Sequence, residues 1–326
     1  MLPPVLFLAA AFGAAGPGAG DLFVLLASKA GFSSAGIPAS YELIFFKIRL
    51  PRILLAAVTG AGLASAGAVF QAVLQNPLAE PYLLGVSSGA SLGATVAIIA
   101  GVGTAAAGIG GLSLFAFAGA CLTILLVMAV SGRLAGGLGS LLLGGIAVGY
   151  IFQAAISLLM MLNREQTERI VFWMMGSFAA ASWAKVAVSA AVVAAGLILM
   201  NSASARLNII SLGPDHAHSL GINPSAAAVF FLLTGCLVTA AVVSVSGIIG
   251  FVGLIVPHLL RFFTGSDHRR LLPACAAGGA ILLVLADLAA RTLLAPQEIP
   301  VGVITAVSGG PFFLFLLRRK RRREAL

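Results

Sequence analysis

The feature that most constrains this chain is a series of ten apolar segments, separated by short polar or glycine- and proline-rich stretches. They span residues 2–15, 53–74, 83–101, 112–130, 141–162, 186–200, 226–245, 248–260, 271–294 and 301–317. Most approach the roughly 20 residues that a helix needs to cross a bilayer. Only 9% of the residues are charged, whereas soluble domains have about 25%. The sequence therefore predicts an all-α, polytopic protein of the lipid bilayer, with about ten transmembrane helices in one domain over residues 1–326.

The distribution of basic residues predicts the orientation. Residues 318–323 are all Arg or Lys and directly follow the last apolar segment. Behind a spanning helix such a run indicates the cytoplasmic side, and it is less typical there of a nucleic-acid-binding tail. With ten spans, both termini are then expected on the cytoplasmic side. The chain itself is expected in the inner membrane of the cell. Without this tail, the loops expected outside carry more basic residues than those expected inside, so the orientation depends on the tail.

Small residues recur at helical spacing within several apolar segments. The positions are Gly60, Ala64 and Ala68, then Gly85, Gly89 and Gly93, then Gly145 and Gly149. Because hydrophobic burial does not drive helices together within lipid, close backbone approach through small residues holds a bundle together. Tight helix packing is the simplest interpretation, and gating by one of these glycines is the alternative. Cys121, Cys236 and Cys275 lie in apolar segments without CxxC spacing and are expected to be packing residues.

Side chains capable of chemistry are scarce. The sequence contains no GxxxxGK[ST] nucleotide loop, no HExxH and no GxSxG, so no catalytic residue is predicted. Asp287 is the one acid well inside an apolar segment, and Arg291 follows one helical turn later. That spacing favours an ion pair within one helix, while a proton-coupled carrier using Asp287 is the alternative function. His216 and His218 would diverge on a helix, so no metal site is expected.

Two segments do not resemble plain spans. In residues 206–224, Gly213-Pro214, Gly221 and Asn223-Pro224 predict two short helices joined by a turn. The apolar residues on this pair indicate a docking surface for another protein. In residues 163–176, a charged stretch runs directly into Phe172, Trp173 and Met174. This pattern is typical of the membrane interface and is also compatible with the mouth of a pore.

Several motifs carry a resemblance to a known family. They are Arg49-Leu-Pro-Arg52, QAVLQNPLAEP at 71–81, LGVSSG at 84–89, FWMMG at 172–176, SLG at 211–213 with AHSLG at 217–221, GIIGFVGLIVPH at 247–258, DHRRLLP at 267–273 and IPVG at 299–302. In this order they resemble the FecCD/BtuC family, the permease subunits of type II ATP-binding-cassette importers. The resemblance implies a BtuC-like fold and a homodimer of two permease copies around one pathway. This sequence departs from the family pattern at the first helix, which is shorter than usual.

The resemblance also implies function and partners. An iron chelate, either a siderophore or haem, or else cobalamin, would move from periplasm to cytoplasm by alternating access. ATP and Mg would be bound by a separate ATPase dimer, so this chain itself needs no cofactor, and a periplasmic binding protein would deliver the substrate. No residue distinguishes these substrates.

The same resemblance assigns candidate residues. Arg49, Arg52 and Arg291 would dock the binding protein, although lipid phosphates or Asp287 could hold them instead. The ATPase would couple through the helix pair at about 212–224, with Leu212, Gly213, Asp215, Ala217, Leu220, Gly221 and Ile222. A pathway or gate is predicted at Gly85, Ser87, Ser88, Gly89, Phe172, Trp173 and Met174.

Overall fold

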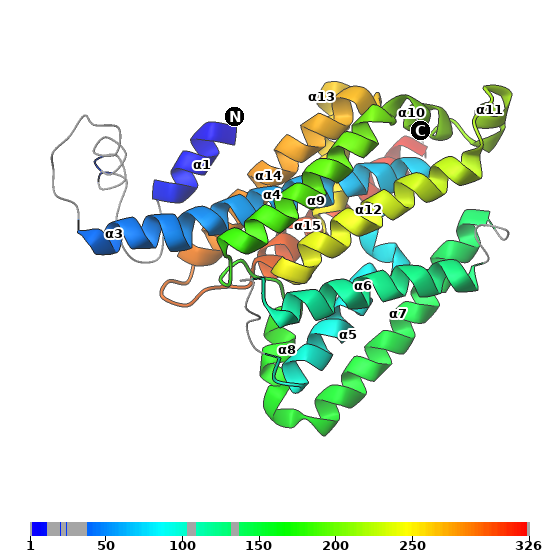
Figure 1. The fold of residues 1–326 in the computed structure, drawn as a ribbon. Coiled ribbons are helices and arrows are strands. Elements are labelled where there is room, and N and C mark those ends of the chain that lie inside the picture. Colours follow the sequence, from blue (N-terminus) through cyan, green and yellow to red (C-terminus); the bar gives the residue numbers. More distant parts are fainter. Residues whose placement is uncertain are drawn as a thin grey trace.

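The computed structural model describes residues 2–11, 20, 24, 38–102, 109–131 and 137–324. Every regular element in these ranges is a helix (Figure 1). Each of the ten predicted apolar segments corresponds to one of them. They are α1 (Leu2–Ala11), α4 (Leu50–Val73), α5 (Val86–Ile99), α6 (Gly111–Val130), α7 (Gly137–Leu162), α9 (Trp183–Ser202), α12 (Pro224–Ser246), α13 (Val252–Thr264), α14 (His268–Thr292) and α15 (Val301–Glu324). The predicted all-α, polytopic fold is therefore confirmed.

Length and composition separate these helices into two groups. Among the described residues, six helices are long and apolar enough to cross a membrane, and the longest runs from Ser40 to Val73. This continuous span joins α3 (Ala39–Leu43), the π-helix η1 (Ile44–Arg49) and α4. The apolar helices α5, α13 and the apolar part of α15 are shorter.

Four short helices lie between the long ones: η2 (Pro81–Leu84), α8 (Thr167–Met174), α10 (Ser204–Ile210) and α11 (Pro214–Ser219), and η4 (Arg164–Gln166) adds a single turn. The predicted helix pair is present, but its boundaries were wrong. The two short helices are α10 and α11, whereas Asn223-Pro224 begins the long helix α12, since the Asn223 side chain accepts a hydrogen bond from the Ala226 N–H. Asn at the N-cap followed by Pro starts a long helix as well as it starts a short one.

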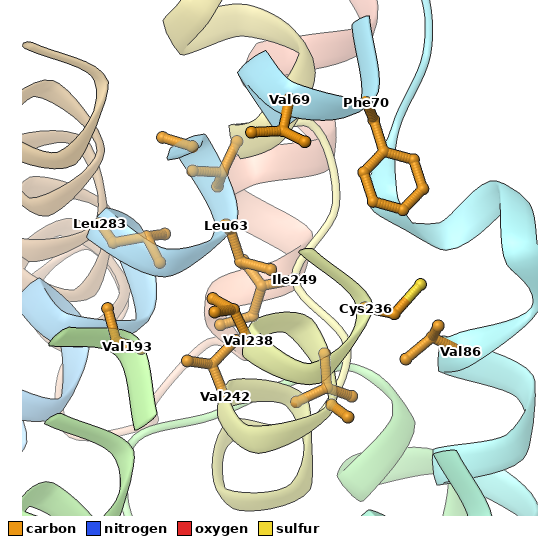
Figure 2. Packing of buried hydrophobic residues seen from close by; sticks show 14 of the residues in the cluster. Leu63, Val69, Phe70, Val86, Val193, Cys236, Val238, Val242, Ile249 and Leu283 are labelled. Atoms are coloured by element: carbon orange, nitrogen blue, oxygen red, sulfur yellow. The ribbon is translucent and has the colours of Figure 1, made fainter. Parts of the chain in front are cut away.

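Helix α4 lies at the centre of the bundle. It packs against α9, α12, α13 and α14, and 78% of the most apolar stretch of the Ser40–Val73 span is buried. Figure 2 shows Leu63 of α4 within the same cluster as Val193 of α9, Val238 of α12 and Leu283 of α14. Helices α5 to α8 form a second group, which joins the first through contacts of α5 and α6 with α12 (Figure 1).

Glycine pairs bring helix backbones into direct contact, as the small-residue spacing predicted. A Cβ built on Gly60 would overlap the carbonyl group of Gly279 on α14, and one built on Gly89 of α5 would overlap Gly119 of α6. Such contacts depend on hydrogen in place of a side chain at both partners. Tight packing is therefore the role that the structure gives to these glycines.

Helix α13 begins inside the bundle, after an unwound segment over residues 247–251. The Tyr82 hydroxyl donates to the carbonyl oxygen of Ile249 at 2.8 Å and accepts from its N–H at 3.3 Å. Pro257 has no N–H to pair with the carbonyl of Gly253, and the Gln71 side chain donates to that oxygen at 3.3 Å. Irregular backbone is tolerated at membrane depth only when protein groups satisfy it, and here α4 and η2 provide those groups.

The contact between Gly60 and Gly279 predicts the effect of adding one methyl group. In Gly60→Ala, the new Cβ would meet rigid backbone, so α4 and α14 must separate, and we expect a loss of about 1–3 kcal/mol of stability. Gly310→Ala on α15 is the matched control, since a Cβ there meets no atom within 4 Å. Thermal unfolding in detergent compares the two variants. Equal midpoints for both would contradict the proposed packing role of Gly60.

Candidate functional site

The predicted docking arginines meet two acids at one end of the bundle, in what we call the arginine cluster: Arg49, Arg52, Asp287, Arg291 and Glu298. Arg49 ends η1, Arg52 lies in the first turn of α4, and Asp287 and Arg291 lie in the last turns of α14. Glu298 comes from the loop between α14 and α15. The cluster therefore joins the start of α4 to the end of α14.

The centre of the cluster is the ion pair between Arg52 and Asp287. The Nε and Nη2 atoms of Arg52 lie 3.0 and 2.9 Å from Oδ1 of Asp287. Nη1 of the same guanidinium lies 2.9 Å from each carboxylate oxygen of Glu298. Nε of Arg291 lies 3.2 Å from Oδ2 of Asp287, which confirms the predicted pair four residues apart on one helix. Charge-assisted hydrogen bonds of this kind are shorter and stronger than hydrogen bonds between neutral groups.

Two arginines of the cluster also bind the first helix. Arg49 Nη1 donates to the carbonyl oxygen of Ala10 at 3.1 Å, and Arg291 Nη2 donates to that of Ala9 at 3.1 Å. Hydrogen bonds from a charged donor are stronger than those between neutral groups. The arginine cluster thus helps to hold α1 against α4 and α14.

Burial decides what these arginines can contact. Arg49, Arg52 and Arg291 are 4%, 7% and 4% exposed, and Asp287 is 1% exposed. The Glu298 side chain is the most accessible carboxylate of the cluster, at 38%. The structure therefore gives all three arginines partners inside the chain, including the Asp287 partner that the sequence offered as the alternative for Arg291. Docking of another protein at these arginines stays a prediction. In the part of the chain that the structure describes, no group of three His, Cys, Asp or Glu side chains could hold a metal ion.

A cavity of about 610 Å³ opens at the same end of the bundle. Its lining comes from α8, the starts of α6 and α9, the end of α12 and the loop after α14, including Phe172, Trp173, Lys185, Ser246 and Glu298. Most of the wall is apolar, and one cation and one carboxylate add charge. Phe172 and Trp173, predicted at the mouth of a pathway, both line this cavity, whereas Met174 does not.

The other predicted gate residues lie elsewhere. Gly85 and Gly89 pack against the backbones of α7 and α6, and the Ser88 hydroxyl donates to the carbonyl of Gly85 at 2.8 Å. Ser87 is partly buried at the start of α5. The structure does not bring this group to the cavity lined by α8, so the two sets of predicted gate residues do not form one site.

The predicted coupling residues gather around α11, at the opposite end of the bundle. Leu212 and Leu220 are 64% and 61% exposed, and Ala217 between them is fully buried. Gly213 and Gly221 bracket α11 with φ angles of 114° and 73°, which glycine adopts without strain. Asp215 is exposed, and the N–H of Ile222 donates to the carbonyl of Ala217 at 2.9 Å. The result is a short helix flanked by two exposed leucines.

Two residues that join distant segments were not identified from the sequence. Glu298 pairs with Arg52, which is 246 residues away. The Asn208 amide donates a hydrogen bond to the Asp267 carboxylate, which is 59 residues away. Both are single polar residues in loops or short helices, without a repeat or a charge run around them. No local signal marks them, since their importance arises from the packing of distant segments.

Comparisons with known proteins agree with this architecture. The FecCD transport family matches residues 2–319. The hemin transport system permease protein HmuU of Yersinia pestis is 41% identical over 86% of this chain and 85% of its own length. The iron(3+)-hydroxamate import system permease protein FhuB of Bacillus subtilis is 39% identical over 94% and 79%. A solved metal-chelate type ABC transporter, in an inward-facing conformation, shares 33% identity with a TM-score of 0.84 over 98% of this chain and 96% of its own.

The arginine cluster predicts a stability cost when its central acid is neutralised. Asp287→Asn leaves two buried guanidinium groups with one carboxylate fewer, and removing one partner of a buried pair costs about 3–5 kcal/mol. We expect a markedly lower thermal midpoint in detergent. Asp215→Asn, the same change at an exposed position of α11, is the control and should leave the midpoint unchanged. Identical midpoints in both variants would show that the cluster does not hold the helices together.

Proposed function

This chain belongs to the FecCD transport family, and from that membership we propose an ATP-driven importer in which it forms the transmembrane pathway together with a second copy of itself. It is a membrane-spanning permease subunit, not an enzyme. The observation that carries the proposal is the match of almost the whole chain, in sequence and in fold, to permeases of this class. The sequence contains no nucleotide-binding loop, so ATP and Mg would bind to a separate ATPase dimer.

The α11 end is the proposed ATPase side. Its support is the pair of exposed leucines on either side of α11, which an aqueous loop does not require. Helix α15 leads from the arginine end to the basic run at 318–323, and its end lies near α10 in Figure 1. A basic run behind a span favours the cytoplasm. Both lines of argument support a cytoplasmic position for α11 and the basic run and an outer position for the arginine cluster. With an even number of spans, the N-terminus would lie in the cytoplasm as well.

The proposed substrate class is a bulky metal chelate: an iron siderophore, haem or cobalamin. The support is the substrates in the names of the relatives, which are hemin, iron(3+)-hydroxamate and cobalamin. A cavity of about 610 Å³ beside α8 offers space on the outer side, with a largely apolar wall. Such a wall suits a large ligand that has to be released again, since few polar groups would hold it.

A periplasmic binding protein would dock at the arginine end. Because Arg49, Arg52 and Arg291 are buried against Asp287, Glu298 and α1, we propose that they support the docking surface from beneath instead of meeting the partner directly. Reversing the charge of Arg52 would bring three carboxylates together and disturb the fold. A loss of docking in such a variant is therefore informative only if thermal stability is unchanged.

The energy source is the first test of this function. In proteoliposomes, uptake of a haem or ferric siderophore probe should require the cognate ATPase and ATP, and should persist when a protonophore collapses the pH gradient. The Asp287 carboxylate is already paired with two arginines, which leaves it poorly suited to carrying protons. Uptake by this chain alone, driven by a pH gradient and lost with the protonophore, would overturn the proposal.

The ATPase contact is the second test. Leu212→Asp/Leu220→Asp should reduce retention of the ATPase on co-purification, because full burial of each leucine against a partner would contribute about 1.5–3 kcal/mol. Leu293→Asp is the control, since this leucine is 63% exposed at the opposite end. The double variant should keep its thermal midpoint in detergent. Wild-type retention in the double variant would place the ATPase contact elsewhere.

A further inference from the structure

Three polar side chains connect α10 to the start of α14, and we call them the Asn208 clamp: Asn208, Asp267 and His268. Asn208 Nδ2 donates to Asp267 Oδ1 at 2.7 Å. Asn208 Oδ1 accepts from the backbone N–H of His268 at 2.9 Å, and the His268 Nδ1 atom lies 2.7 Å from the same oxygen. One amide thus makes three contacts with two consecutive residues, the first of them 59 positions away.

The chemistry of the clamp fixes its orientation. Asp267 is a pure acceptor when ionised, and the backbone N–H of His268 is a pure donor, so only one orientation of the Asn208 amide satisfies both. Because the amide oxygen can only accept a hydrogen bond, His268 must carry its proton on Nδ1. The pKa of the Asp267 carboxyl lies below its ordinary value because the Asn208 amide and the Arg269 N–H donate to it. Asp267 therefore remains a charged acceptor at neutral pH.

Asn208 is not needed to form α14 itself. Asp267 is the N-cap of this helix, where its side chain accepts from the Arg269 N–H at 3.0 Å and its carbonyl accepts from Leu271 at 2.9 Å. A helix with its own N-cap can begin without Asn208. The contacts of Asn208 instead determine where α14 begins relative to α10.

Helix α14 connects the two ends of the molecule. One end carries the clamp, and the other carries Asp287 and Arg291 of the arginine cluster. Between them, the contact of Gly279 with Gly60 holds α14 against α4. On the α10 side, Leu207 and Ile210 are buried, and Gln75 at the end of α4 donates to the carbonyl of Ile210 at 3.2 Å. Helix α10 is therefore fixed to the same two helices that hold the arginine cluster.

We propose that Asn208 is a positioning residue, which makes α10 and α11 move together with α14 and so transmits ATPase movement toward the arginine end. This inference rests on the proposed function, because it takes α11 as the ATPase contact. A rigid helix held at both ends transmits a displacement along its axis, whereas an α10 that slides on α14 would absorb it. Loss of the clamp would thus separate ATP hydrolysis from uptake without removing the ATPase.

The test uses two isosteric changes at one hydrogen bond. Asn208→Asp replaces the donor that faces Asp267 by a second carboxylate. The double variant Asn208→Asp/Asp267→Asn restores the pairing with donor and acceptor exchanged. In it, the amide introduced at position 267 could donate to the carboxylate at position 208 and still accept from the Arg269 N–H. Asn201→Asp, the same change at an exposed residue of α9, is the control for added charge.

The measurement is the number of haem or siderophore probe molecules imported per ATP hydrolysed by the reconstituted complex. We expect Asn208→Asp to retain the ATPase and its hydrolysis while this ratio falls about fivefold or more. One lost net hydrogen bond corresponds to about a fivefold change, and the two facing carboxylates add repulsion. The exchanged double variant should recover most of the ratio, and Asn201→Asp should match the wild type. Recovery separates a positional role from a general loss of stability.

Three results would overturn the inference. A normal ratio in Asn208→Asp would show that the clamp transmits nothing. Loss of the ATPase in that variant would show that the clamp only shapes the docking surface. An equal loss in the exchanged double variant would show that the pairing itself is irrelevant. If the wild-type complex itself imports no probe in the presence of ATP, the proposed function fails instead, which distinguishes that failure from a failure of the clamp.

Discussion

The close contact between α4 and α14 is the interaction on which the rest of the structure depends. Gly60 and Gly279 allow the two backbones to touch, and no hydrophobic force between helices would replace that contact in lipid. At this separation, Arg52 on α4 reaches Asp287 on α14 through two of its nitrogen atoms. A larger residue at either glycine would move these helices apart and lengthen the ion pair. The packing of small residues therefore determines the geometry of the charged ones.

The helices around this pair are held by polar groups as well as by packing. Gln71 on α4 donates to the carbonyl that Pro257 leaves free, and its own oxygen accepts from Arg261 Nη1 at 2.5 Å. Tyr82 satisfies both backbone groups of Ile249 in the unwound segment before α13. Backbone without regular structure persists within a membrane protein only where such partners exist. The irregular start of α13 is thus a built feature, fixed by side chains from two other elements.

The sequence was sufficient to predict the class of fold, and the reason is physical. Each span must be apolar over most of its length, so residues 271–294, for example, indicate α14 to within a few positions. Asp287 and Arg291 were predictable as a pair because one helix fixes their distance. Arg52 and Glu298 were not, since their approach depends on how α4 packs against α14 and on the path of a loop. For the same reason, the local sequence around α11 was sufficient to predict exposed leucines there. The burial of the arginines could not be predicted in this way, because it depends on the packing of distant helices.

In the arginine cluster, the buried charges fix the relative positions of the helices more than they add to the stability of the protein. Removing ions from water is expensive, and a buried pair often contributes little compared with an apolar pair of similar size. This cluster contains three arginines and two acids, and two of the arginines, Arg49 and Arg291, direct their charge at carbonyl oxygens of α1. A carbonyl oxygen is a directional acceptor, and a hydrogen bond from a charged donor is stronger than one between neutral groups. An apolar contact would hold α1 in several registers, whereas two guanidinium groups aimed at the carbonyls of Ala9 and Ala10 select one. The described part of the first helix is therefore positioned against α4 and α14 by charged hydrogen bonds as well as by packing.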